Sequence, residues 1–146
     1  HWIGRTLEIP VSAYLDVRLA GMRRWKTFTV VGTGGREARQ WLGHASESGV
    51  GPIVVLTHPA EFIRRIGDDY TNLRRNDTAR SRFRELCEFL KVHPCEFEVV
   101  TFSGQLAEWT GERGTDNPHW HTSPLSRFLR VVENRISDYG FTAQNH

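Results

Sequence analysis

The stretch Pro52-Ile53-Val54-Val55-Leu56-Thr57-His58-Pro59 decides the predicted fold. Its run Ile53–Leu56 is continuously apolar and rich in β-branched residues. Such a run is typical of a strand buried on both faces of a parallel sheet. The apolar character stops at Thr57 and His58, and α/β folds bind ligands at the carboxyl ends of their strands. His58 is therefore the first candidate functional residue, because imidazole exchanges protons near neutral pH. The alternative is a histidine that caps the strand and bonds a neighbouring loop.

A helix and a second strand follow this stretch. Asp77 or Thr78 can act as the N-cap of a helix that runs to Val92. Phe97–Phe102 is the next β-type run, so the order from Ile53 onward predicts a parallel βαβ unit with a right-handed crossover. The predicted apolar face of the helix comprises Phe83, Leu86, Cys87 and Leu90, with Phe89 widening it. A buried free thiol is expected for Cys87. The predicted fold class is α/β with parallel strands.

The residues before this unit contain shorter signals. Leu7–Val11 and Phe28–Val31 are β-type runs, whereas the segment from Ser12 to Arg24 fits either a loop or a short helix. The glycine-rich stretch Gly32–Gly35 precedes a helical pattern over residues 36–42. Glycines before a helix can hold a phosphate. This stretch lacks the lysine and the spacing of a P-loop, so a flexible turn is the preferred interpretation.

The C-terminal part is predicted to be mainly helical. Ser103 can cap a short helix over residues 105–110, and a polar loop follows over residues 111–118. Ser123 is a good N-cap and Pro124 suits the first position of a final helix, which Gly140 is expected to stop. One apolar stripe of this helix is expected to face the core, with docking of a partner as the alternative; it comprises Leu125, Phe128, Leu129, Val132 and Ile136.

Composition limits the possible classes of protein. The 146 residues suffice for one domain with a core, and 38% hydrophobic and 25% charged residues are ordinary for a globular chain. Of the 19 basic residues, 17 are arginines, but they alternate with acids and the net charge is only +2. Solvated helix faces are expected for most of them, and nucleic-acid binding is disfavoured. The two cysteines form neither a disulfide framework nor a CxxC pair.

The ends and the hydropathy of the chain bear on its origin and compartment. It begins His1-Trp2-Ile3-Gly4, without an initiator methionine or a signal segment, which favours a piece of a longer chain or a processed product. No apolar run approaches the ~20 residues that span a bilayer. The compartment therefore stays open, with the cytoplasm as the default.

Two further sets of residues are weak candidates for metal binding. Asp68-Asp69 lies in a long arginine-rich connection after the His58 strand, where a solvated loop is the preferred interpretation. His119 and His121 point to the same side only if they lie on a strand. Since zinc requires three or four protein ligands and no third one lies nearby in the sequence, a zinc site is disfavoured.

The order of these segments resembles a known family. The series Leu7–Val11, Val54–Phe62, Arg82–Leu90 and Phe97–Phe102 looks like the back half of a polysaccharide deacetylase-like domain, carbohydrate esterase family four. The resemblance covers about residues 5–105, and it rests on the ordered series because no single motif in it is diagnostic. It implies the C-terminal part of a distorted (β/α) barrel, with residues 103–146 as a helical extension of one partial domain spanning residues 1–146.

The resemblance also implies a reaction. Members of this family remove acetyl groups from sugars with a divalent metal, for which zinc is expected in the full domain. A metal-bound water acts as the nucleophile and an aspartate as the base. A late strand ends in a histidine that protonates the leaving sugar amine or alkoxide, and His58 is the matching position. The implied substrate is an acetylated surface polysaccharide or exopolysaccharide.

Departures from the family pattern keep a second hypothesis open. The family's Asp-Asp pair and His-x-x-x-His metal motif precede the matched part, and no His-x-x-x-His exists in these 146 residues. Only His58 is carried over, and this chain alone supports no metal. The alternative is a non-catalytic α/β module that binds carbohydrate or protein through Trp41, Trp109 and Trp120. An incomplete barrel would expose strand edges, so self-association through sheet edges is also expected.

Overall fold

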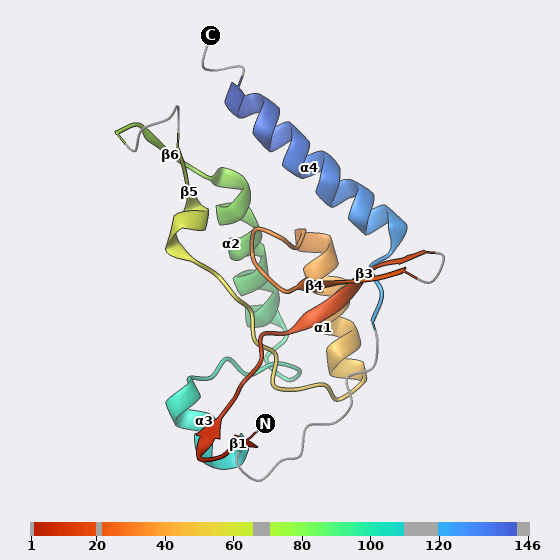
Figure 1. Ribbon diagram of the computed structural model, residues 1–146, viewed down its shortest axis with the longest axis vertical. Helices are drawn as coiled ribbons and strands as arrows, with labels where there is room; N and C mark the ends of the chain where they lie inside the picture. Colours follow the sequence, from red (N-terminus) through yellow and green to blue (C-terminus); the bar gives the residue numbers. More distant parts are fainter. Residues whose placement is uncertain (1, 20–21, 66–70, 110–119, 143–146) are drawn as a thin grey trace.

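A computed structural model describes residues 2–19, 22–65, 71–109 and 120–142 (Figure 1). This part of the chain combines helices with three small antiparallel sheets, so the coarse prediction of a mixed α/β chain is confirmed. The strands are β1 (Trp2–Ile3), β2 (Thr6–Leu7), β3 (Ala13–Leu19), β4 (Met22–Thr27), β5 (Ile63–Arg65) and β6 (Leu73–Arg75). The helices are α1 (Gly35–Glu47), the 3-10 helix η1 (Pro59–Phe62), α2 (Asp77–Val92), α3 (Phe102–Trp109) and α4 (Pro124–Thr142).

The largest sheet is the β3–β4 hairpin, in the segment that fitted a loop or a short helix. Its register pairs Leu15 with Trp25 and Val17 with Arg24, so Asp16 is the extra residue of a β-bulge. A bulge bends its strand and redirects a side chain. Asp16 is buried together with Tyr14 and Leu15, although it belongs to a two-stranded sheet.

Helix α1 confirms the helical pattern predicted after the glycine-rich stretch. The turn before it is closed by Thr29, whose side-chain Oγ1 accepts the Gly32 N–H at 2.8 Å and whose carbonyl accepts the Thr33 N–H at 3.0 Å. At the other end, Ser48 is the C-cap, and Gly49 follows with a φ of 65°. Glycine is favoured there because other residues resist the left-handed conformation.

The core lies where α1 meets the strands and α2. Its buried centre contains Tyr14, Phe28, Ala38, Trp41 and Leu42. The ring of Phe28 packs at 4.8 Å from that of Trp41, measured between centroids. Half-buried side chains surround this centre, namely Ile53, Val55, Leu86, Phe89, Leu90, Phe97 and Trp120. The apolar residues of the opening stretch therefore do contact the core.

The predicted parallel βαβ unit is not formed, because Ile53–Leu56 and Phe97–Phe102 are not strands. In the first segment, alternate residues face the core, and the backbone bonds only at intervals: the Val54 carbonyl accepts the Ser12 N–H at 3.0 Å, and the Leu56 N–H donates to the Phe28 carbonyl at 3.0 Å. Thr29 and Leu56 form an isolated parallel bridge. One bridge does not make a ladder, so the segment is extended without being a strand.

The second predicted strand departs further from expectation. Val99 is 78% exposed, and Phe102 already begins helix α3. A strand needs backbone partners on a neighbouring segment, and none of the three sheets in the described part includes these residues. Ser103, expected to cap this helix, lies within it.

Helix α2 agrees with its predicted span, but Asn76 is the N-cap and accepts the Ala79 N–H at 3.3 Å. Leu86, Phe89 and Leu90 pack on the core as predicted. The burial predicted for Cys87 is wrong, because the thiol is exposed. The fully buried residues of α2 are Ala79 and Arg82. The buried face is therefore rotated about the helix axis from the predicted apolar face.

Helix α4 starts as predicted. Ser123 accepts the Ser126 N–H at 3.1 Å, and Pro124 is the first helical residue. The predicted stop at Gly140 is wrong, because the helix continues to Thr142. The apolar stripe was expected to face the core, and this too is wrong. The buried positions are Ser126 and Arg130, since polar partners from other elements hold this face.

The predicted extension over residues 103–146 includes α3 and α4, and α4 packs against α1 and α2. The boundary itself remains a prediction. Most arginines were expected on solvated faces, but Arg82 and Arg130 are buried. In the described part of the chain, no helix is long and apolar enough to cross a membrane.

Candidate functional site

His58 is exposed, at the point where the extended segment ends and η1 begins. Its ring nitrogen Nδ1 accepts the Ala60 N–H at 3.1 Å, and its carbonyl accepts the Glu61 N–H at 2.9 Å. In return, the Glu61 carboxylate accepts the His58 N–H at 3.3 Å and the Thr57 hydroxyl at 3.2 Å. These reciprocal bonds form a capping box, which fixes the histidine on a short rigid turn.

The hydrogen bond at Nδ1 determines which proton chemistry is open to His58. A nitrogen that accepts an N–H carries no hydrogen, so the neutral ring has its hydrogen on Nε2. The Nε2–H group can donate to a ligand without disturbing the turn. A doubly protonated ring cannot accept at Nδ1, so each act of protonation must release Ala60. The geometry therefore allows both the predicted catalytic role and the capping role.

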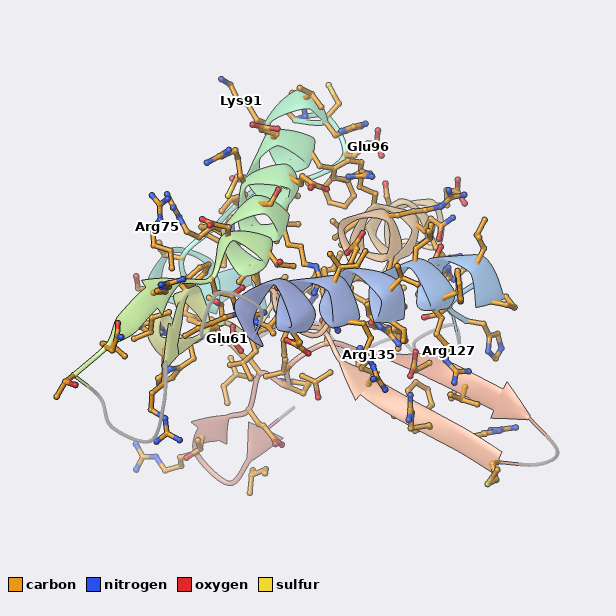
Figure 2. All side chains as sticks on the ribbon, turned by 90° about the horizontal axis from the view of Figure 1, so that it is seen from above. Glu61, Arg75, Lys91, Glu96, Arg127 and Arg135 are labelled. Carbon is orange, nitrogen blue, oxygen red and sulfur yellow. The ribbon has the colours of Figure 1, made fainter. Side chains whose placement is uncertain are left out.

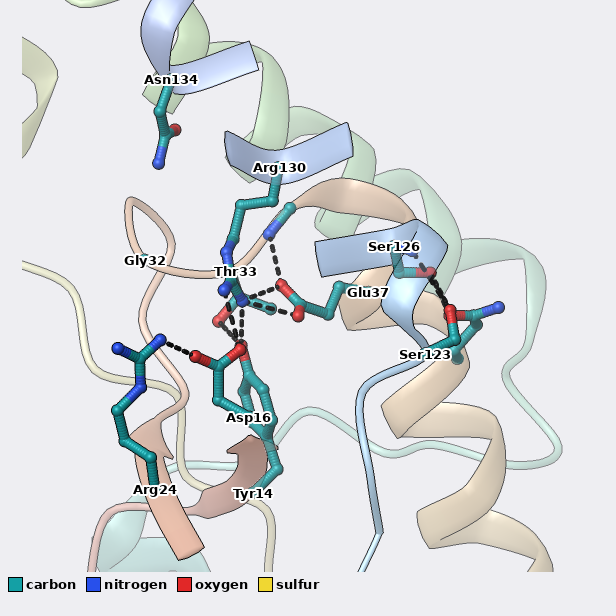
Figure 3. Close-up of polar contacts among 12 residues, drawn as sticks. Tyr14, Asp16, Arg24, Gly32, Thr33, Glu37, Ser123, Ser126, Arg130 and Asn134 are labelled. Carbon is teal, nitrogen blue, oxygen red and sulfur yellow. Dashed lines mark hydrogen bonds and ion pairs between the residues drawn. The ribbon is translucent and has the colours of Figure 1, made fainter. Parts of the chain in front are cut away.

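A second cluster was not found from the sequence; it lies in the interior (Figure 3). Arg130 of α4 donates through Nη1 to both oxygens of Glu37, at 2.6 and 2.7 Å, and through Nη2 to Asp16 at 2.7 Å. The side chains of both carboxylates are 0% exposed. The other oxygen of Asp16 pairs with Arg24. Four charged groups from β3, β4, α1 and α4 thus neutralise one another; Asp16, Glu37 and Arg130 are buried, and Arg24 reaches Asp16 from an exposed position.

Uncharged groups complete this ion cluster, defined as Asp16, Arg24, Glu37 and Arg130. The Tyr14 hydroxyl lies 3.2 Å from the Thr33 hydroxyl and 3.5 Å from Arg130 Nη1. The Gly34 N–H donates to Glu37 at 3.2 Å, and the Gly32 and Thr33 N–H groups bond Thr29. These bonds favour the interpretation of the glycine-rich stretch as a turn over a phosphate site.

The cluster shifts the acid–base properties of its members. Burial alone would raise the pKa of Asp16, but hydrogen bonds from Arg24 and Arg130 outweigh it and hold the pKa below its usual range. Burial would likewise lower the pKa of Arg130, and its bonds to Asp16 and Glu37 raise it instead. Burial is also the main reason why the pKa of Tyr14 is raised. All three groups are therefore locked in one protonation state at neutral pH.

Lys26 is the cluster's titratable neighbour. It is half-buried on β4, in register with Tyr14 on β3. Burial, and then the positive charge of Arg130, lower the pKa of Lys26 to about 8. Its ammonium group is therefore a charge near the cluster that can be lost under mildly alkaline conditions. Apart from this lysine, the arrangement is a structural ion network whose donors and acceptors are mutually satisfied.

The other sequence candidates do not converge on His58. Asp68, Asp69 and His119 lie outside the described residues. His121 is exposed, and its backbone forms an isolated parallel bridge with Leu15. Across residues 2–19, 22–65, 71–109 and 120–142, no group of three or more histidine, cysteine, aspartate or glutamate side chains could hold a metal. The described residues therefore offer no ligand set for the metal that the family resemblance implies.

The tryptophans proposed as stacking surfaces are also placed differently. Trp41 is buried in the core, so its assignment to a binding surface is wrong. Trp120 is half-buried and packs edge-on against Tyr14, with ring centroids 5.5 Å apart. The side chain of Trp109 lies outside the described part.

Comparisons with models of protein families, with curated proteins and with solved structures find no match to this chain. The functional interpretation therefore rests on the residues and on their geometry.

Proposed function

We propose that this chain is the C-terminal portion of a polysaccharide deacetylase-like hydrolase, with His58 as the group that protonates the departing sugar. The observation that carries the proposal is the presentation of His58: an exposed imidazole on a turn fixed by its own capping box. The turn directly follows an apolar segment that contacts the core. A proton donor must be held in place while remaining open to a large substrate. The bond from the His58 backbone N–H to Glu61 does not depend on the protonation of the ring, so it holds the residue in place while the imidazole stays exposed.

His58 supplies one proton in the proposed step. As a water oxygen bonds to the acetyl carbon and its proton passes to a base, the bond from this carbon to the sugar nitrogen or oxygen breaks, and the departing atom takes a proton from Nε2 of the doubly protonated His58 ring. The ring that gives a proton from Nε2 must also carry a hydrogen on Nδ1. Because Nδ1 then cannot accept a hydrogen bond, the Ala60 N–H bond to it must break during the cycle. The described residues supply no metal set, so in the proposed enzyme the metal ligands come from other residues.

The exposed strand-type segments support the same proposal. Val99 and Val100 are exposed in a run with strand-forming composition that belongs to none of the described sheets. Apolar, β-branched residues in such a run are suited to pairing with further strands. In the proposed architecture, the remaining part of a (β/α) barrel provides those strands, and the apolar segments become buried.

The test is acetate release from an acetylated polysaccharide by the polypeptide isolated from its native source, with divalent metal supplied. His58→Ala removes both the acid and the cap, so it alone does not separate the two roles. His58→Asn keeps an oxygen that can accept the Ala60 N–H but has no group that can act as an acid near neutral pH. Loss of a general acid slows the reaction by about 100-fold or more.

The expected result is a comparable loss of rate in His58→Ala and His58→Asn, with wild-type rates in the matched control His93→Asn. His93 ends α2, where its Nδ1 lies 2.7 Å from the Phe89 carbonyl. Full activity of His58→Asn would mean that His58 only caps η1. If even the wild type released no acetate, the alternative of a non-catalytic binding module would be favoured.

A further inference from the structure

Helix α4 has two faces of opposite character, and the polar face is the inner one. Arg130 bonds Glu37 and Asp16, and the Ser126 hydroxyl donates to Gln40 of α1 at 2.7 Å. Farther along α4, Arg64 donates to Ser137 and Asp138, and the Thr78 hydroxyl also donates to Ser137. Arg82 donates to Glu133 and Asn134. Hydrogen bonds and ion pairs thus attach this helix to the protein.

The apolar face points away from these partners. Leu125 is 53% exposed, Phe128 62%, Leu129 37% and Ile136 66%, while Val132 is half-buried. Leu125, Leu129, Val132 and Ile136 are separated by four, three and four residues. This alternation is the a/d pattern of helices that pack along one another. We define these four residues and Phe128 as the α4 stripe.

We propose that the α4 stripe is the interface of a homodimer, in which the α4 helices of two copies pack antiparallel about a two-fold axis. In such a pair, an a position of one helix meets a d position of the other. Leu125 then packs on Ile136 of the second copy, and Leu129 packs on Val132. A two-fold axis repeats each contact, so one stripe supplies both sides of the interface.

The positions of Phe128 and Arg135 favour an antiparallel second copy. Phe128 and Arg135 occupy equivalent flanking positions one heptad apart, and antiparallel packing brings Phe128 of one copy next to Arg135 of the other. Arg135 extends from α4 on the side away from α1 and α2 (Figure 2). A guanidinium over an aromatic ring is attractive, and no like charges meet along the stripe. Antiparallel helices also oppose their dipoles, and a net charge of +2 gives little repulsion between copies.

The size of the stripe sets the strength of the dimer. If each large exposed side chain covers on the order of 100 Å², each copy buries ~400 Å² and the pair ~800 Å². This is below the size of stable interfaces and within the range of weak ones, so dissociation constants in the micromolar range are expected. The stripe also lies far from the exposed strand-type segment around Val99, because α3 and α4 lie at opposite ends of the molecule (Figure 1). The dimer is therefore independent of the proposed function.

Analytical ultracentrifugation over a range of micromolar concentrations tests the proposal. The wild-type chain should pass from monomer to dimer. Phe128→Ser and Ile136→Ser should weaken the association by tenfold or more, with unchanged circular dichroism because both side chains point outward. Val92→Ser is the matched control: Val92 is an exposed valine of α2, and its replacement should change nothing.

Cross-linking tests the antiparallel register. With Cys87 and Cys95 both replaced by serine, a mixture of the Leu125→Cys and Ile136→Cys chains should form mixed disulfide dimers, whereas neither chain alone should do so efficiently. A chain that stays monomeric at every concentration would overturn the proposal. Association that persists in both stripe variants would also overturn it, because the interface would then lie elsewhere, for example at the exposed strand edges.

Discussion

Replacing Arg130 by methionine should be the most destabilising single change at a polar residue. The substitution keeps an unbranched side chain of similar length and leaves the Asp16 and Glu37 carboxylates buried without their shared cation. Glu37 loses two bonds, and Asp16 retains only Arg24. Removing one partner of a buried ion network costs about 3–5 kcal/mol. Since a domain of this size is stable by roughly 5–15 kcal/mol, the loss is a large fraction of the total.

Urea denaturation at neutral pH, followed by tryptophan fluorescence, measures this loss. The buried Trp41 and the half-buried Trp120 both report on the core. Arg127→Met is the matched control, because Arg127 is an exposed arginine of the same helix and its replacement should change the free energy of unfolding by less than about 0.5 kcal/mol. Equal free energies of unfolding for the two variants would refute the assignment of Arg130 as the cation that stabilises the cluster.

The free energies of unfolding of wild type and Arg130→Met should differ in their dependence on acid pH. The pKa of Asp16 is lowered in the folded protein, so its contribution is complete above the unfolded value of about 3.9 and is lost as pH falls through the folded value. Without Arg130, the pKa of Asp16 is lowered by less. The difference in stability between wild type and Arg130→Met should therefore narrow as the pH falls below about 4. A difference that stayed constant with pH would show that lost packing, rather than lost charge, causes the destabilisation.

Two further predictions concern single side chains. Because the pKa of Lys26 is lowered to about 8 in the folded protein, the unfolded chain binds more protons above that pH, and stability should rise from pH 8 toward pH 10. Lys26→Met should abolish this rise in urea titrations, and an unchanged slope would contradict the assignment. Asn76→Ala removes the N-cap of α2 and the 2.8 Å bond from its amide to the Glu61 carbonyl. It should cost about 1–2 kcal/mol in thermal unfolding, whereas Asn72→Ala, at an exposed residue outside the helix, should cost little.

The helices were the predictable part of the fold, because their signals are local. Ser123 and Pro124 lie directly at the start of α4, and the apolar spacing of α2 placed Leu86 and Leu90 on the core. The N-cap of α2 was predicted at Asp77 or Thr78, next to Asn76, which forms it. Strand pairing was less predictable because the partners are distant in sequence. The run Ile53–Leu56 has strand composition, but its backbone bonds depend on Ser12 and Phe28, whose positions no local pattern reveals.

The ion cluster was missed for the same reason. Arg130 reaches Glu37 across 93 residues and Asp16 across 114 residues, and each of these charges alone looks like part of a solvated face. The face of α4 that turns inward was also unpredictable, since apolar spacing normally identifies the buried side. Here the ion pairs of Arg130 fix the opposite side. His58 was the candidate that the sequence could supply, because it follows an apolar run directly, and the structure adds its exposure and its bond to Ala60.

The central claim, that these residues belong to a metal-dependent hydrolase, is tested most directly by the intact mass and the metal content of the polypeptide isolated from its native source. The proposed function predicts a mass well above 16.8 kDa and a tightly bound divalent cation in each chain. A mass of 16.8 kDa without bound metal would contradict it, and His58 would then be the cap of a structural turn.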